Sequence, residues 1–228
     1  MTQVMCLPYA GAGAGVYRPW KALASDRARA VPIQLPGREE EFTKACWADF
    51  AEAAAGTAER IVAAAAGEPF VIFGHSFGAL LAYETVRHLL ATGGPLPRRL
   101  IVSGSRSPRH RGYLPLSDND DEAVAGLELD GQRGFEALNH PELRALLLPV
   151  LRADARLLST YEPSGLDPLP VPLTALRGTT DTVAAPVEEW DDWKTFTTEE
   201  YTALHLPGGH LYLLDAMPEL WRVIEEQL

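Results

Sequence analysis

The chain has 228 residues, of which 46% are hydrophobic and 22% are charged, and its formal net charge is -11. This apolar content is enough for a buried core, and the length suits one α/β domain over residues 1–228 with a modest insertion. The net negative charge argues against nucleic acid or an anionic membrane as a general partner, because both are negatively charged themselves.

The N-terminus and the cysteines indicate the cellular compartment. The first four residues show no charged segment leading into a long apolar run, so we expect no signal peptide, and no apolar run is long enough to span a bilayer. Cys6 and Cys46 cannot form a disulfide framework or a metal motif. We therefore expect a cytoplasmic protein that holds no metal, and we expect a monomer.

The first predicted strand, residues 3–7, leads into a glycine-rich loop at residues 8–15. The loop does not match the dinucleotide pattern Gly-x-Gly-x-x-Gly, because the third glycine is missing, and no Walker-type Gly-Lys-Ser/Thr follows. Such a loop can also bring a backbone N–H close to a reacting carbonyl, with Ala10 as the candidate donor and Gly11 as the alternative. A simple connecting turn would explain the glycines as well.

Strands and helices alternate along most of the chain. The predicted strands cover residues 3–7, 31–35, 70–73, 99–104, 171–177 and 202–206, and the predicted helices cover residues 17–24, 50–66, 79–90, 187–193 and 218–228. This alternation predicts a mostly parallel central sheet that is covered by helices on both faces, which is the α/β class.

The alternation stops between about residues 105 and 163. This segment begins with a basic loop, continues through an acidic turn at residues 118–121, and then carries leucines at helical spacing over residues 143–158. We interpret it as a helical lid inserted into the sheet domain. The same leucines would also suit an ordinary packing layer.

The strand at residues 70–73 runs into Gly-His-Ser-Phe-Gly at residues 74–78, and a helical pattern follows at once. Gly-x-Ser-x-Gly between a strand and a helix is typical of a nucleophile elbow, although the bare pattern also occurs by chance. The elbow would present the hydroxyl of Ser76 at the C-terminal edge of the sheet. The backbone N–H of Phe77 would face the same space from a helix N-terminus, where negative charge is favoured.

A serine hydroxyl needs a base within hydrogen-bond reach, and that base needs a partner that fixes its tautomer. Asp181 and His210 each follow a predicted strand, so both should lie at the same edge of the sheet as Ser76. The chain order Ser, Asp, His is the order of α/β-hydrolases. The alternative bases are His75, His88, His110, His140 and His205, and the alternative acids are Asp154, Asp167 and Asp215.

Several segments resemble those of type II thioesterases, the stand-alone editing enzymes of polyketide and nonribosomal peptide pathways. They are residues 7–11, 35–39, 74–79, 148–154 and 206–210, in the order of the family. The resemblance covers nearly the whole chain. One departure is the pair Gly11-Ala12, where members of the family usually have two glycines.

The resemblance implies an α/β-hydrolase fold with a helical lid. It also implies hydrolysis of acyl groups stalled on the phosphopantetheine arm of an acyl or peptidyl carrier protein, with no cofactor of the enzyme's own. The site residues that it implies are Ser76 as nucleophile, Asp181 and His210 as its partners, and Ala10 and Phe77 as donors of the oxyanion hole.

Carrier proteins are usually acidic, so a chain with a net charge of -11 needs a locally basic entrance. Arg106, Arg109 and Arg111 lie where the sheet passes into the predicted lid, and we expect them, with Arg38, to meet the carrier or the phosphate of its arm. A solvated surface run would explain these arginines equally well.

Three other functions are compatible with the same motifs. One is a small-molecule carboxylesterase with the same three side chains. Another is an inactive hydrolase that only binds acyl carriers, which the intact set of Ser76, Asp181 and His210 disfavours. The last is a chain-terminating domain cut from a megasynthase, which the short chain disfavours.

Overall fold

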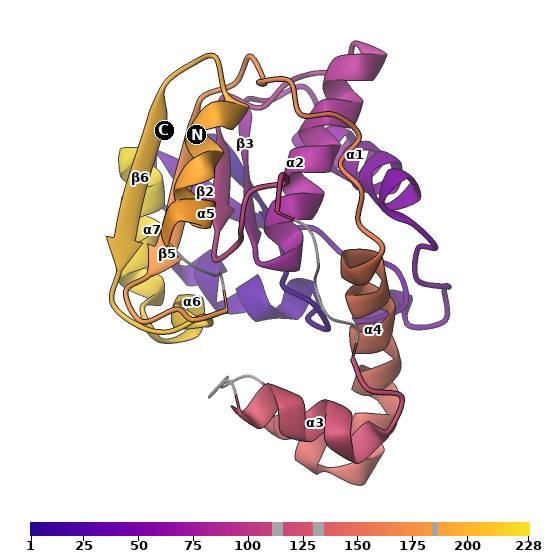
Figure 1. The fold of residues 1–228 in the computed structure, drawn as a ribbon. Coiled ribbons are helices and arrows are strands. Elements are labelled where there is room, and N and C mark those ends of the chain that lie inside the picture. Colours follow the sequence, from indigo (N-terminus) through magenta and orange to yellow (C-terminus); the bar gives the residue numbers. More distant parts are fainter. Residues whose placement is uncertain (111–115, 130–134, 184–186) are drawn as a thin grey trace.

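The computed structural model describes residues 1–110, 116–129, 135–183 and 187–228 (Figure 1). Within these ranges, six parallel strands form one sheet in the order β2-β1-β3-β4-β5-β6. The strands are β1 (Thr2–Leu7), β2 (Ala28–Pro32), β3 (Phe70–His75), β4 (Leu100–Ser103), β5 (Leu173–Gly178) and β6 (Tyr201–Leu206). The predicted parallel sheet is confirmed. All carboxyl ends of the strands lie along one edge, which is where open α/β sheets bind ligands.

Helices cover both faces of this sheet (Figure 1). One face carries α1 (Phe50–Ala65), α2 (Phe77–Thr92), α5 (Val187–Asp191) and the 3-10 helix η4 (Asp192–Phe196); the other carries η1 (Ala14–Leu23), α6 (Tyr212–Asp215) and α7 (Met217–Glu226). A short 3-10 helix, η2 (Glu39–Glu41), lies in the loop after β2. The helices predicted at residues 50–66, 79–90 and 218–228 therefore agree with α1, α2 and α7 within about two residues.

The strand β1 shows why the apolar runs of this chain form the centre of the sheet. Met5 and Leu7 pack into the apolar core under α1 and α2, whereas Val4 and Cys6 pack into the core under η1 and α7. Successive side chains of a strand point to opposite faces, so a strand with both faces covered needs an unbroken apolar sequence.

The second strand lies earlier than predicted, at residues 28–32 and not at residues 31–35. Among the described residues it is an edge strand that pairs only with β1, from Thr2 opposite Ala28 to Cys6 opposite Pro32. Ile33 and Leu35 suggested the later range, and both are buried, but they lie in the loop beyond β2. Apolar residues indicate that a segment is buried, but backbone hydrogen bonding determines where a strand begins and ends.

The predicted insertion contains α3 (Asp120–Leu129), η3 (Glu136–Asn139) and α4 (Pro141–Ser159), and Figure 1 shows this group extending beyond one end of the sheet. Its helices share a small apolar cluster made of Ala123, Val124, Leu138, Leu148 and Leu151. In the described ranges, no helix combines the length and apolar character that crossing a membrane requires. A lid function and the single-domain organisation stay predictions.

Candidate active site

Ser76 lies in the sharp turn between β3 and α2, with φ +54° and ψ −115°, a backbone region that residues other than glycine rarely adopt. Two glycines make the turn possible. A Cβ on Gly74 would collide with the backbone carbonyl of Gly78, and a Cβ on Gly78 would collide with the carbonyl oxygens of Leu7 and Pro8. The local structure is therefore the strained strand–turn–helix that a nucleophile elbow requires.

The side chain of His210 lies between those of Ser76 and Asp181. Its Nε2 atom is 3.0 Å from Ser76 Oγ, and its Nδ1 atom is 3.1 and 3.2 Å from the two carboxylate oxygens of Asp181. Asp181 is 1% exposed and His210 is 8% exposed. The structure thus brings together the three predicted residues in a geometry through which a hydroxyl proton can pass to the imidazole.

The loops that carry Asp181 and His210 are packed against each other through their backbones. A Cβ on Gly178, at the end of β5, would collide with the carbonyl of Gly208. The N–H of Thr180 donates to that same carbonyl oxygen at 3.0 Å. The separation of acid and base is therefore fixed by main-chain contacts as well as by their own hydrogen bonds.

His75 is buried behind His210, with the two ring centroids 5.1 Å apart. Its Nδ1 atom is 2.8 Å from Ser103 Oγ, and that hydroxyl also contacts the hydroxyl of Tyr212. Burial, together with the neighbouring His210, holds the pKa of His75 well below its usual value. His75 is therefore a neutral supporting group and not the base. Sequence reasoning missed the hydrogen bonds through which Ser103 and Tyr212 support His75; the one available signal was that Ser103 ends a buried strand.

The two predicted oxyanion donors lie at the start of α2 and on the loop after β1, two segments that pack together at Gly78. Phe77 begins α2, so its N–H belongs to the first helical turn, whose donors have no partner within the helix. Within the described ranges, the N–H of Ala10 donates to no protein group. The N–H of Gly11, the alternative donor, is bound to a carboxylate oxygen of Asp154 at 2.8 Å. Ala10 is therefore the stronger candidate.

The structure contradicts one part of the prediction for Arg38, contact with the surface of the carrier protein. Its guanidinium forms two hydrogen bonds with the carboxylate of Asp154, at 2.7 and 2.8 Å, and the side chain is 5% exposed. A buried guanidinium that is paired in this way cannot lie on a protein–protein surface. Arg38 is part of the wall of the cavity beside the glycine-rich loop, so its contact with the phosphate of the arm stays a prediction. The same pair excludes Asp154 as an alternative to Asp181.

The other predicted carrier contacts differ in accessibility. The side chain of Arg106 is 19% exposed and lies 3.6 Å from a carboxylate oxygen of Glu189. Arg109 is exposed, and its guanidinium lies over the ring of Phe196, 5.7 Å from the ring centroid. Arg111 lies outside the described residues. Contact of Arg106 and Arg109 with a carrier stays a prediction.

Two of the alternative bases are occupied elsewhere. The Nε2 atom of His110 lies 2.8 Å from Asp192 Oδ2, and the ring of His205 packs on that of Trp190 with centroids 4.9 Å apart. In the part of the chain that the structure describes, no three His, Cys, Asp or Glu side chains are grouped closely enough to bind a metal.

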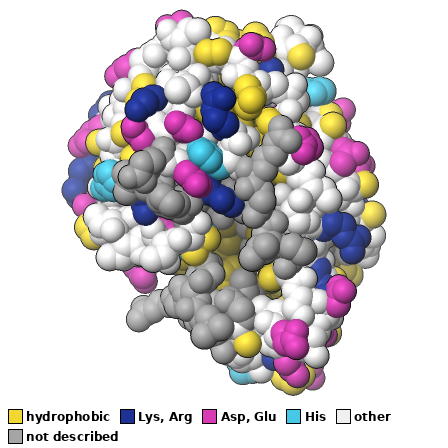
Figure 2. Space-filling model, viewed as in Figure 1, with side chains coloured by type: hydrophobic (Ala, Val, Ile, Leu, Met, Phe, Trp, Pro, Cys, Tyr) yellow, Lys and Arg dark blue, Asp and Glu magenta, His cyan; other side chains and the backbone are white. Residues whose placement is uncertain are grey.

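A cavity of about 740 Å³ lies beside the glycine-rich loop. Its wall includes Tyr9 and Gly11, the two neighbours of Ala10, together with Val150 and Leu151 of α4; Ser76 is not part of it. Figure 2 shows hydrophobic side chains inside a hollow between the sheet body and the end of the molecule formed by α3 and α4. The volume is in the range of small-molecule sites.

Comparison with known proteins places this geometry in a family. The family model described as "Thioesterase domain" matches residues 2–228. The chain belongs to the thioesterase family. It is 32% identical to the thioesterase PikA5 of Streptomyces venezuelae, over 99% of this chain and 80% of that protein.

Two solved structures show the same fold as this thioesterase. RedJ, from the prodiginine biosynthetic pathway of Streptomyces coelicolor, has a TM-score of 0.90 and 32% identity, over 100% of this chain and 90% of that chain. BorB, a type II thioesterase from the borrelidin biosynthetic cluster, has a TM-score of 0.87 and 32% identity, over 99% of this chain and 91% of that chain. The predicted α/β-hydrolase fold and the predicted resemblance to type II thioesterases are confirmed, and thioester hydrolysis is the activity of the family.

Proposed function

We propose that this thioesterase uses Ser76, His210 and Asp181 to remove acyl groups from the phosphopantetheine arm of acyl or peptidyl carrier proteins in a secondary-metabolite pathway. The observation that carries the proposal is the placement of His210, within 3.0 Å of Ser76 Oγ on one side and 3.1 Å of Asp181 on the other, in a chain of the thioesterase family. The enzyme needs no cofactor, because the thioester itself is the activated group.

In the first half of the reaction, His210 Nε2 takes the proton of Ser76 as Oγ bonds to the thioester carbon. The N–H groups of Phe77 and Ala10 stabilise the negative charge that develops on the carbonyl oxygen. When the tetrahedral intermediate collapses, the carbon–sulfur bond breaks and the proton on His210 passes to the departing thiolate. The products of this half are the free thiol of the arm and an ester on Ser76.

In the second half, His210 takes a proton from a water molecule whose oxygen attacks the ester carbon on Ser76. Collapse of this second intermediate breaks the bond between carbon and Oγ, and the proton on His210 returns to Ser76. The acyl group leaves as a carboxylic acid. Asp181 stays ionised throughout and stabilises the imidazolium that forms twice in each cycle.

The carrier is acidic in this proposal, and Arg109 is the exposed cation best suited to meet it or the phosphate of its arm. Arg106 contributes less, since it already lies beside Glu189. The change Arg109→Glu should reduce kcat/KM for an acyl-carrier several-fold more than for a free acyl-thiol mimic. Equal effects on the two substrates would remove Arg109 from this role.

The decisive test uses three matched substrates that carry the same acyl group: an acyl-carrier, a free acyl-thiol and an oxygen ester. We expect hydrolysis with burst kinetics and a preference for the acyl-carrier, and the change Ser76→Ala should abolish both turnover and labelling by a fluorophosphonate probe while the protein stays folded. A preference for the oxygen ester would favour a carboxylesterase instead. Full turnover in the Ser76→Ala protein would exclude the proposed mechanism.

A further inference from the structure

We propose that Asp154 of α4 is a positioning residue for the oxyanion hole, and that Arg38 neutralises and orients its carboxylate. The inference rests on the proposed function, because it concerns the loop that carries Ala10. It connects α4, which belongs to the predicted lid segment, with the backbone N–H of Ala10, which stabilises the tetrahedral intermediate.

The N–H of Ala10 belongs to the peptide between Tyr9 and Ala10, so the turn at Tyr9–Ala12 holds this N–H through the carbonyl oxygen of Tyr9. The N–H of Ala12 donates to the carbonyl oxygen of Tyr9 at 3.1 Å, and Gly11 has φ +78°. A hydrogen-bonded turn with a positive φ at its third residue is a type II turn, in which Ala10 and Gly11 occupy the two central positions. Glycine also tolerates the type I form, so the central peptide needs another group to hold it in one orientation.

Asp154 supplies that group. One of its carboxylate oxygens accepts the N–H of Gly11 at 2.8 Å, and this N–H belongs to the central peptide of the turn. Since the N–H and C=O of a trans peptide point in opposite directions, the carbonyl of Ala10 must point away from Asp154. A flipped peptide would place that carbonyl oxygen against the buried carboxylate, which repels it.

Arg38 binds both Asp154 and the backbone of the turn. Its guanidinium binds both carboxylate oxygens of Asp154 and also donates to the carbonyl oxygen of Ala12 at 3.0 Å. The buried pair therefore contacts the turn at Gly11 and at Ala12. A pair that only anchored α4 to the body of the protein would not need two bonds to the backbone of this loop.

A packing contact on the same helix supports this link. The side chain of Leu151, three residues before Asp154, lies so close to Gly11 that a Cβ added there would be 3.0 Å from its Cδ1 atom. Residues three apart lie on the same face of a helix, so α4 contacts the turn through both side chains. A displacement of α4 would therefore displace the turn and the N–H of Ala10.

The test compares two double variants that differ only in whether Gly11 keeps an acceptor. The amide variant carries Arg38→Met with Asp154→Asn, and the leucine variant carries Arg38→Met with Asp154→Leu. Neither leaves an unpaired buried charge, so both should fold. We expect the leucine variant to lose about 10- to 100-fold in kcat with KM changed less than about twofold, and the amide variant to keep at least about a third of wild-type kcat.

A second measurement distinguishes a misplaced N–H of Ala10 from a general loosening of the active site. A trifluoromethyl ketone analogue of the acyl-thiol forms a tetrahedral adduct with Ser76 and uses the oxyanion hole, whereas the corresponding thioether does not. In the leucine variant, the dissociation constant of the ketone should rise by the same factor by which kcat/KM falls. The dissociation constant of the thioether should stay at its wild-type value. The change Tyr161→Phe is the matched control, because the 2.7 Å hydrogen bond that it removes joins Tyr161, just beyond α4, to Glu84 and not to the turn; it should leave kcat unchanged.

The results of these tests distinguish failure of this inference from failure of the proposed function. Equal kcat in the two double variants, or an equal loss of ketone and thioether binding in the leucine variant, would overturn the positioning of the turn by Asp154. If the leucine variant does not fold, a tenfold loss of kcat in the amide variant would also overturn it, because the retained acceptor should preserve the turn. Failure of the proposed function would show in the wild type itself, as absent thioester hydrolysis and absent labelling of Ser76.

Discussion

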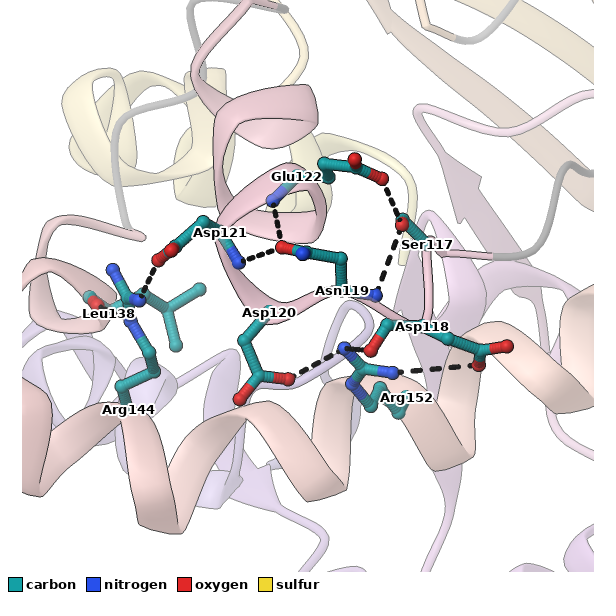
Figure 3. Close-up of polar contacts among 9 residues, drawn as sticks. All are labelled: Ser117, Asp118, Asn119, Asp120, Asp121, Glu122, Leu138, Arg144 and Arg152. Carbon is teal, nitrogen blue, oxygen red and sulfur yellow. Dashed lines mark hydrogen bonds and ion pairs between the residues drawn. The ribbon is translucent and has the colours of Figure 1, made fainter.

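The helix α4 is held in place by two opposite kinds of ion pair. The first is buried: Asp154 is paired with Arg38, and the two side chains are 2% and 5% exposed. The second is exposed: Arg144 binds Asp121 and Arg152 binds Asp120, with the two aspartates 87% and 63% exposed (Figure 3).

This difference in exposure indicates which contacts of α4 are strong and which are easily broken. A buried pair has lost its hydration, so breaking one partner leaves a charge that nothing compensates. An exposed pair exchanges its partner for water at little cost and is screened by salt. The contacts of Figure 3 therefore hold α3 on α4 only weakly, whereas the pair at Asp154 joins α4 firmly to the body of the protein.

The largest effect should follow from breaking the buried pair on one side. The single change Asp154→Leu leaves Arg38 buried without its carboxylate, and we expect the free energy of unfolding to fall by about 3–5 kcal/mol. Urea unfolding followed by circular dichroism measures this. The leucine variant, in which Arg38→Met is also present, should recover most of the loss. An equal loss in the single and double variants would show that charge burial is not its cause.

Apolar contacts sharpen the same contrast where α4 meets α3. Leu148 is 3% exposed in the cluster shared with α3, so Leu148→Ala should lower the free energy of unfolding by about 2–3 kcal/mol. Leu146 is 66% exposed, and Leu146→Ala should change it by less than about 0.5 kcal/mol. Similar losses for the two changes, measured by thermal unfolding, would mean that α3 does not cover α4 in solution.

Buried and exposed ionisable groups should also differ in their dependence on pH. The pKa of His75 is lowered by burial, and this ring is surrounded by Ser103, Tyr9, Tyr212 and the pair of His210 with Asp181. An unfolded histidine has a pKa of about 6.5, so below that pH the unfolded state binds a proton that the folded state does not. The free energy of unfolding should therefore fall as the pH is lowered from about 7 to 5.

The contribution of His75 has a maximum slope of about 1.4 kcal/mol per pH unit. The change His75→Gln should reduce the slope over this range, whatever it does to the stability at pH 7. The change His205→Gln, at an exposed position on β6, keeps the buried ring and serves as the control. An unchanged slope in the His75→Gln protein would show that the buried imidazole is not the group that titrates.

The smallest effect belongs to the exposed pairs. The change Arg152→Ala removes the 2.7 Å contact with Asp120 and should lower the free energy of unfolding by no more than about 1 kcal/mol. The difference from the wild type should shrink further in 0.5 M salt, because ions screen exposed charges. A large loss that persists in high salt would mean that the contacts in Figure 3 are stronger than their exposure suggests.

The sequence predicted the sheet, the elbow and the meeting of three catalytic candidates, because these depend on local patterns. A strand before Ser76, a helix after it, and strands ahead of Asp181 and His210 are enough to bring the three to one edge of a parallel sheet. Chain order then left few alternatives.

The sequence did not predict the partner of Arg38. A charged residue in a loop is usually solvated, and its carboxylate lies 116 residues further along the chain. Local patterns carry no information about a contact of that range. The same reason explains why the chain of hydrogen bonds through Ser103 and Tyr212 was missed: a serine and a tyrosine at the ends of two separate elements show no shared pattern before the fold joins them.

The contact between Gly11 and Leu151 limits how this enzyme can be re-engineered. A side chain larger than hydrogen at position 11 would meet Leu151 as well as the strain of a positive φ. If residues 141–159 were replaced by those of a relative, a different side-chain surface would therefore pack against the unchanged loop at Gly11. Productive chimeras should need residues 8–13 and 141–159 from the same parent, because the two segments pack directly on each other.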